Sequence, residues 1–245
     1  MEIYKQTLTR GQVLTAGASD AGVREDNEDA MLIRPDLGLY AVCDGMGGHG
    51  HGDVAAAHAI QGVERSIAET DQTASLEARV KQALAAAAAA VRRAGQVVSP
   101  DDPIGTTLTM ILVDDERFVC GHVGDSRLHR LRDRIEQLSK DHNLAEELRA
   151  HGVTDPKTLR PYEGVLTHYL GSDKHSDGDV FACELRNGDR FLLCSDGLNV
   201  VPPESLQTAL AHDLDQVPEL LLDKASHFSS TDNITALVVA VELAD

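Results

Sequence analysis

Four apolar segments of this 245-residue chain each have an aspartate at one end, and this pattern constrains the fold more than any other feature. Asp44 follows LYAVC, Asp125 follows FVCGHVG, Asp196 follows RFLLCS, and Asp232 precedes NITALVVAV. Short apolar runs bounded by turn residues are typical of buried strands. Strand ends converge in a layered β-structure, so we expect the four carboxylates to lie close together.

The rest of the chain predicts further strands and several helices in one α+β domain covering residues 1–245. Strands are expected at 12–19, 30–34, 37–43, 106–124 with a turn at 114–116, 126–139 with a turn at 132–134, and 233–243; helices are expected at 53–70, 74–95, 143–152, 203–212 and 216–228. No repeat or long linker divides the chain, and two β-layers with flanking helices are the natural packing for such a set.

Three local signals refine this prediction. Gly95 follows a run of strong helix formers and is the expected C-cap of the second helix. The segment VFACELRNGDRFLLCSDG predicts a β-hairpin that turns at Asn187-Gly188. Residues 153–179 are rich in Pro, Gly, Asp and His, and we expect irregular structure there.

The acidic composition excludes some partners. A formal net charge of −18 makes the chain a poor candidate for binding nucleic acid or an anionic membrane, because both carry the same sign. No apolar run approaches the ~20 residues that span a membrane, and the first ten residues do not resemble a signal peptide. The four cysteines all follow apolar residues and form no Cys-x-x-Cys pair, so we expect reduced, buried strand residues in a cytoplasmic protein.

The stretch CDGMGGHGHG places five glycines in the eight residues after Asp44. Such a cluster indicates either a flexible turn or a backbone that bends sharply and approaches another group closely. A loop at a strand end is a favoured place for functional groups on a rigid scaffold. The sequence therefore predicts a close backbone approach beside the Asp44 carboxylate.

Four carboxylates gathered without partners would repel one another. Divalent cations that prefer oxygen ligands, such as Mg²⁺ or Mn²⁺, would relieve this repulsion. An aspartate shared between two ions, beside a water that the ions make acidic, is the machinery of hydrolytic phosphoryl transfer. Each aspartate taken singly is more typical of an ordinary turn, and it is the repetition on four segments that indicates a metal site.

Eight segments, in order along almost the whole chain, carry a more specific pattern: SDAGVREDNEDA, VCDGMGGHGHG, GTTLT, VGDSR, LSKDHN, LTHYLG, LLCSDGL and TDNITALVV. They resemble the motifs of the metal-dependent protein phosphatases of the protein phosphatase 2C type, the PPM family, in their bacterial form. The resemblance implies a four-layer α-β-β-α sandwich with two central antiparallel β-sheets flanked by helices, and a variable flap at about 141–179. It also implies hydrolysis of phosphoserine and phosphothreonine in proteins by a metal-activated water at a multinuclear Mn²⁺ or Mg²⁺ site.

The resemblance further assigns metal-binding roles. Asp44 matches the aspartate that bridges two metal ions, and Gly45 matches the glycine whose carbonyl ligates one of them. Asp196 and Asp232 match ligands of the first ion. Asp125 matches the aspartate that, together with the one matching Asp196, holds a third and weaker ion in bacterial members.

Other residues match positions around the ions. Arg24 matches the arginine that binds the substrate phosphate, and its planar fork fits two phosphate oxygens at once. A surface arginine paired with Glu25 or Asp26 is the competing interpretation. Glu28 and Asp29 match acidic residues that hold metal-bound waters.

The proton donor is less defined. Met46 stands where many eukaryotic members carry a histidine proposed as the general acid. His49 and His51 are nearby candidates, because an imidazole with an ordinary pKa of about 6.5 can donate a proton at neutral pH. Water on the metal is the alternative donor.

The expected partners follow from the same resemblance. They are phosphorylated proteins and a cognate bacterial serine/threonine kinase that a monomeric phosphatase would oppose. A catalytically inactive phosphatase-like scaffold or sensor is the alternative function. Such a scaffold would be expected to lack one of the metal aspartates or the phosphate arginine, and this chain has all of them.

Overall fold

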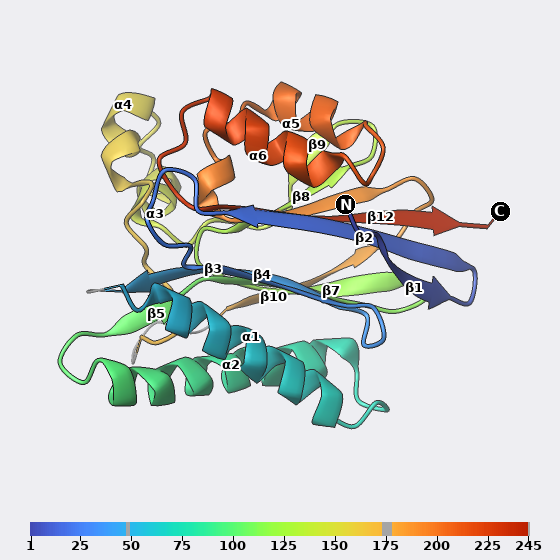
Figure 1. The fold of residues 1–245 in the computed structure, drawn as a ribbon, viewed down its shortest axis with the longest axis horizontal. Coiled ribbons are helices and arrows are strands. Elements are labelled where there is room, and N and C mark those ends of the chain that lie inside the picture. Colours follow the sequence, from blue (N-terminus) through green and yellow to red (C-terminus); the bar gives the residue numbers. More distant parts are fainter. Residues whose placement is uncertain (48–49, 173–177, 245) are drawn as a thin grey trace.

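The computed structural model describes residues 1–47, 50–172 and 178–244, and these residues form two antiparallel β-sheets packed face to face (Figure 1). Sheet one runs in the order β1 (Tyr4–Leu8), β2 (Gly11–Asp20), β12 (Ile234–Leu243), β11 (Arg190–Cys194), β8 (Arg127–Leu131) and β9 (Ile135–Gln137). Sheet two runs in the order β10 (Asp179–Glu184), β7 (Arg117–Val123), β6 (Leu108–Val113), β4 (Leu39–Gly47) and β3 (Asp29–Arg34), and β5 (Ile104–Thr106) pairs with the end of β4.

Helices cover the outer face of each sheet. Figure 1 shows α1 (Gly52–Glu69) and α2 (Leu76–Val98) on the outside of sheet two, and α5 (Pro203–Leu210) and α6 (Val217–His227) on the outside of sheet one. The short elements α3 (Leu144–Ala150), α4 (Pro156–Leu159), η1 (Arg160–Tyr162) and η2 (Asp196–Leu198) lie between strands in the chain. The expected four-layer α-β-β-α sandwich is confirmed.

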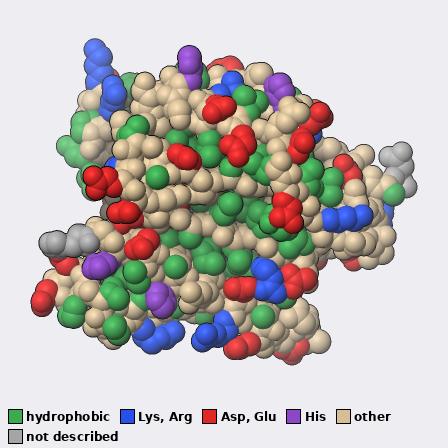
Figure 2. All heavy atoms as spheres, in the orientation of Figure 1, with side chains coloured by type: hydrophobic (Ala, Val, Ile, Leu, Met, Phe, Trp, Pro, Cys, Tyr) green, Lys and Arg blue, Asp and Glu red, His purple; other side chains and the backbone are tan. Residues whose placement is uncertain are grey.

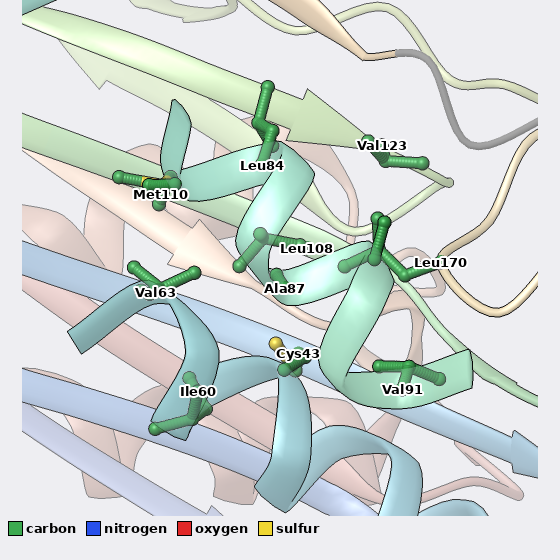
Figure 3. Close-up of a cluster of buried hydrophobic side chains, with 14 of the residues drawn as sticks. Cys43, Ile60, Val63, Leu84, Ala87, Val91, Leu108, Met110, Val123 and Leu170 are labelled. Atoms are coloured by element: carbon green, nitrogen blue, oxygen red, sulfur yellow. The ribbon is translucent and has the colours of Figure 1, made fainter. Parts of the chain in front are cut away.

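Three apolar clusters hold the four layers together. Figure 3 shows the first, in which Val63 of α1 and Leu84 of α2 pack over Met110 of β6. A second cluster lies between sheet one and the helices α5 and α6. The third fills the space between the sheets, where the rings of Phe118 and Phe191 meet edge to face with centroids 4.8 Å apart. Burying each large apolar side chain contributes about 1.5–3 kcal/mol, so the clusters fix how the sheets stack and where their ends meet.

Several details of the predicted secondary structure are wrong. The helix expected to end at Gly95 continues to Val98, and the Ser99 N–H donates to the Gly95 carbonyl at 2.9 Å. The segment around Asn187-Gly188 does turn, but its two strands do not form a hairpin: β10 pairs with β7 in sheet two, whereas β11 pairs with β8 and β12 in sheet one. The turn therefore carries the chain from one layer to the other.

The predictions for cysteines and membrane segments have clear outcomes. Cys43, Cys120 and Cys194 are buried strand residues with free thiols, as expected. Cys183 is free but only half-buried, because β10 is the edge strand of sheet two. No helix within the described ranges is both long and apolar enough to cross a membrane. Figure 2 shows acidic side chains spread over the face in view, in keeping with the net charge of −18.

Candidate active site

A cleft of about 450 Å³ brings the four predicted aspartates together. Asp44 comes from β4 and Asp125 follows β7, both in sheet two, while Asp196 follows β11 and Asp232 precedes β12 in sheet one. The described residues lining the cleft are Arg24, Glu25, Asp26, Glu28, Asp44, Gly45, Met46, Gly47, Thr107, Asp125, Gly164, Leu166, Asp196, Asp232 and Asn233. A larger groove of about 640 Å³ lies between α1 and α2, but none of the predicted site residues lines it.

The glycines around Asp44 serve a close backbone approach. β4 does not end at Cys43 as expected; it continues to Gly47, and residues 45–47 pair with β5. A Cβ on Gly45 would lie 2.1 Å from the Gly52 carbonyl oxygen and 2.5 Å from the Glu28 carbonyl oxygen. Only glycine fits this contact, so the strand bearing Asp44 passes directly against the start of α1.

Two buried polar residues that the sequence analysis did not single out fix the cleft backbone. The Thr107 Oγ1 accepts the Asp44 N–H at 2.9 Å, and the Thr107 N–H donates to the Asp44 carbonyl at 2.9 Å. The Asn233 side chain accepts the Glu28 N–H at 2.8 Å and donates to the carbonyls of Ala21 and Asp26 at 3.0 and 2.8 Å. Both residues lie in segments with a family resemblance, which was the available signal.

Asp29 lies beside Asp44 as its cross-strand partner in the β3–β4 ladder. Its Oδ2 accepts hydrogen bonds from the hydroxyls of Ser195 and Thr235, each at 2.7 Å, so sheet one holds this side chain of sheet two. Its Oδ1 is buried and accepts no hydrogen bond from the described residues. A buried carboxylate oxygen needs a partner, and here a water or a cation would supply it.

The carboxylates of the cleft raise one another's pKa. Loss of hydration, and then the nearby carboxylates of which Asp29 is the foremost, raise the pKa of Asp44 well above its ordinary range. Burial and the charge of Asp196 raise the pKa of Asp125 to about 8. Burial, and then the charges of Asp196 and Asp232, raise the pKa of Asp29 to about 6, although its two hydroxyl donors oppose the shift. Burial and the charge of Asp232 raise the pKa of Asp196. The cleft thus gathers carboxyl groups whose charged forms are disfavoured by burial and by mutual repulsion.

Arg24 stands at the rim of this cleft. Its Nε donates to the Thr231 carbonyl at 2.8 Å, and one terminal nitrogen donates to Asp232 Oδ2 at 2.9 Å. The side chain is 55% exposed and forms neither of the pairs with Glu25 or Asp26 that a surface arginine was expected to make. Its guanidinium is therefore held beside the candidate ligand Asp232 and is open to solvent.

The remaining predicted residues differ in their positions. The Glu28 Oε1 accepts the N–H of Gly52 at 3.0 Å, which places this carboxylate at the first residue of α1 and on the cleft wall. Met46 lines the cleft. His51 is half-buried just before α1 and is not among the described residues that line the cleft. His49 lies outside the described residues.

The donor set of the cleft fits hard divalent cations. All of its candidate ligands are oxygens, and oxygen ligands suit Mg²⁺ and Mn²⁺. Within the described ranges, no three acidic, imidazole or thiol side chains form a ready-made coordination cluster. Ions that keep several waters and take one or two carboxylates each match such an open arrangement, as does the partnerless Oδ1 of Asp29.

Comparison with known proteins identifies the class. The family model for protein phosphatase 2C matches residues 16–237, which contain every predicted site residue. The chain therefore belongs to the protein phosphatase 2C family, a family of metal-dependent protein phosphatases.

Particular relatives agree with this class. The serine/threonine phosphatase stp of Listeria monocytogenes serotype 4b is 30% identical over 244 residues, covering 96% of this chain and 94% of that protein. The crystal structure of the catalytic domain of PstP in complex with two manganese ions is 31% identical, with a TM-score of 0.84 over 95% of this chain and 99% of that one. PppA of Pseudomonas aeruginosa, described as a regulatory component of T6SS, is 31% identical, with a TM-score of 0.81 over 97% of this chain and 99% of that one.

Proposed function

We propose that this chain hydrolyses phosphoserine and phosphothreonine in proteins at the cleft between the sheet ends, with Mn²⁺ or Mg²⁺ as cofactor. The observation that carries the proposal is the meeting of Asp44, Asp125, Asp196 and Asp232 with Arg24 in one cleft of a protein phosphatase 2C chain. The phosphoprotein substrate class follows the names of the relatives, and the manganese follows the PstP structure with two manganese ions.

Named residues would hold the ions. Asp44 and the Gly45 carbonyl would bind the two core ions, with Asp196 and Asp232 on the first of them. Asp125, with Asp196, would hold a weaker third ion. Glu28 and Asp29 would act through waters, which suits the partnerless Oδ1 of Asp29. Bound divalent ions would supply Lewis-acid activation of water and would neutralise charge on the phosphate.

The chain's own groups would orient the substrate. The exposed guanidinium of Arg24, fixed by Thr231 and Asp232, can donate hydrogen bonds to two oxygens of a phosphate that enters the cleft. Asn233 bonds to the carbonyls of Ala21 and Asp26, on either side of Arg24, and so fixes the loop that carries it. Gly164 and Leu166, in the proposed flap at about 141–179, also line the cleft, and the substrate chain would lie against them.

The proposal favours an active enzyme over a scaffold. An inactive scaffold would have no reason to keep repelling carboxylates in a half-buried cleft, since each disfavours the metal-free fold. The position of His51 outside the cleft lining does not favour it as the proton donor, although His49 remains a candidate. In the cell, the enzyme would oppose a serine/threonine kinase that phosphorylates the same proteins.

Hydrolysis of a phosphothreonine peptide and of p-nitrophenyl phosphate, with Mn²⁺, with Mg²⁺ and with excess EDTA, tests the proposal. We expect activity with either metal and none with EDTA. The variant Asp213→Asn is a matched control, since this exposed aspartate lies between α5 and α6 and should not change activity. Equal activity with EDTA would refute the metal mechanism, and no activity on any phosphopeptide would refute the enzyme.

A further inference from the structure

The loop that carries Asp125 is held from two sides by the chain around residue 142. Gly124, just before Asp125, is buried and has a φ of +106°. The His142 N–H donates to the Gly124 carbonyl at 2.8 Å, and the Gly124 N–H donates to the Nδ1 of the His142 ring at 3.2 Å. One residue thus satisfies both backbone groups of Gly124.

The ring contact also fixes how the imidazole is used. Because Nδ1 accepts from Gly124, the proton of the neutral ring sits on Nε2. This Nε2 faces the Asp179 Oδ2 at 3.4 Å. The ring is 13% exposed and packs against the rings of His122 and His168, whose centroids are 4.9 and 5.0 Å away. Packing against these two rings helps to hold the Nδ1 lone pair toward Gly124.

Thr107 and Asp141 also restrain the Asp125 loop. A Cβ on Gly124 would lie 2.6 Å from the Thr107 side chain, so the loop packs against the residue that fixes Asp44. The hydroxyl of Ser126 lies 2.6 Å from the Thr107 hydroxyl. After it, Arg127 forms a two-pronged pair with Asp141, the neighbour of His142, with contacts of 2.6–3.1 Å.

The Asp125 carboxylate itself receives no hydrogen bond from another side chain within the described part of the chain. It is 5% exposed and points into the cleft that it lines. Its position is therefore set by its backbone, and the backbone is set by the contacts on either side. Loss of the contact from His142 would leave a buried N–H without a partner and allow the loop to move.

We propose that His142 is a positioning residue that holds Asp125 in place to bind the weakest divalent ion, through the bond from the Gly124 N–H to Nδ1. This inference rests on the proposed function, since it takes Asp125 as a metal ligand. The role belongs to the ring, because the His142 backbone has its own anchor: the Thr167 N–H donates to the His142 carbonyl at 2.9 Å. Substitution of the ring should therefore leave the chain path intact.

Two substitutions separate the two nitrogens of the ring. His142→Asn keeps an acceptor close to the place of Nδ1 and loses the reach to Asp179. His142→Gln keeps the reach of Nε2 and loses the acceptor for Gly124. Asp179→Asn, which weakens the Nε2 contact alone, is the control. If Nδ1 is the working atom, His142→Asn and Asp179→Asn should resemble the wild type and His142→Gln should not.

The first readout uses the metal-free protein. In ¹⁵N–¹H spectra, the Gly124 amide proton should move upfield and exchange faster in His142→Gln, and should keep its hydrogen-bonded position in His142→Asn.

The second readout is calorimetric titration with Mn²⁺, in which His142→Gln should weaken only the weakest binding step, by about fivefold or more for one lost hydrogen bond. The third is kinetic: the Mn²⁺ concentration for half-maximal activity should rise by the same factor, with KM for a phosphothreonine peptide and kcat at saturating Mn²⁺ within about twofold of wild type.

The possible outcomes decide the proposal. If His142→Gln loses the Gly124 signature but binds Mn²⁺ like the wild type, His142 does not position a metal ligand. If His142→Asn and His142→Gln are equally impaired and melt at equally lower temperatures, the ring has only a packing role and the proposal is overturned. If the wild type neither hydrolyses the peptide nor binds Mn²⁺, the proposed function fails and this inference fails with it, a result distinct from failure of the variants in an active wild type.

Discussion

The carboxylates inside this sandwich form two groups that differ in what faces them. Asp189, fully buried, accepts two hydrogen bonds of 2.7 Å from Arg132 and one of 2.9 Å from the Arg186 N–H. Asp141, 6% exposed, accepts hydrogen bonds from the guanidinium of Arg127 and from the side-chain amide of Gln137. In the cleft, Asp44 instead faces other carboxylates, and burial together with their charges raises its pKa well above the ordinary range.

The difference separates carboxylates that stabilise the fold from carboxylates that oppose it. A charge removed from water is tolerated when a cation and hydrogen bonds replace the lost hydration, as at Asp189. Like charges gathered without a cation destabilise each other. The chain thus has the means to neutralise a buried aspartate and does not use them at Asp44, which is what a site completed by an external cation requires.

The largest expected effect is at Asp44. Asp44→Asn should lower kcat/KM at saturating Mn²⁺ by about 10³-fold, equivalent to ~4 kcal/mol, because it would remove the charge that the two proposed core ions share. The same change should raise the melting temperature of the metal-free protein, since one repelling charge is gone. Phosphopeptide kinetics and thermal denaturation in EDTA check both signs. If the variant kept half of its activity, Asp44 would not be a core ligand.

Removing a carboxylate of the paired group should lower the stability of the fold and leave the activity unchanged. Asp189→Ala should lower the free energy of unfolding by about 3 kcal/mol, because it leaves Arg132 and a backbone N–H without their partner. The loss should be the same with and without Mn²⁺, and kcat/KM of the folded protein should stay near wild type. Urea denaturation with and without the metal measures this. An unchanged midpoint would mean that the pair with Arg132 is not a stabilising contact.

Sequence alone predicted the cleft group better than the paired group. The cleft group is recognisable because the same pattern occurs four times, at Asp44, Asp125, Asp196 and Asp232. A carboxylate at the end of an apolar run can be identified without any knowledge of the fold. Asp189 gave no such signal. It follows the turn at Asn187-Gly188, and local turn chemistry does not specify whether the two strands share a sheet.

The hydrogen-bond partners of the supporting residues could not be predicted, although the family resemblance covers the segments that contain these residues. Thr107 acts on Asp44 from 63 positions away, and Asn233 acts on Glu28 from 205 positions away. Both act by bonding to backbone groups, which every residue has, so no pattern in the sequence selects the partner. The four-layer order, in contrast, followed from apolar periodicity and the family resemblance, because each helix and strand shows its buried face locally.

The acid response sharpens the comparison further. His129 of β8, 8% exposed and close to Arg127, has its pKa lowered to about 4 by burial and then by the Arg127 charge. The unfolded chain therefore takes up this proton first, and the stability that depends on the neutral ring is complete above pH ~6.5 and lost as the pH falls toward ~4. His129→Leu should reduce the loss between pH 6.5 and 5 by about 2 kcal/mol.

Urea denaturation of both proteins at those two pH values, in EDTA, measures the difference. His58, which lies on α1 away from this region, provides the matched control His58→Leu. We expect the loss of stability on acidification to depend on the neutral ring of His129 beside Arg127, and not on His58. If His129→Leu and His58→Leu showed the same pH dependence as the wild type, this attribution would be wrong.

The smallest effect is expected at Arg24. This arginine pairs with a carboxylate of the cleft group while remaining exposed, so it shares a feature with each of the two groups. An exposed pair adds little stability, so Arg24→Ala should leave the free energy of unfolding within ~0.5 kcal/mol of wild type. Its kcat/KM for a phosphothreonine peptide should fall about tenfold, through KM, as one charge-assisted contact to the phosphate is lost. Arg24→Lys should recover only part of this, since an ammonium lacks the planar fork.

The Mn²⁺ requirement of Arg24→Ala should stay within about twofold of wild type. Should Arg24→Ala instead shift the Mn²⁺ requirement and leave KM unchanged, the guanidinium would serve Asp232 and not the phosphate, and Arg24 would belong with the pairing arginines of the sandwich.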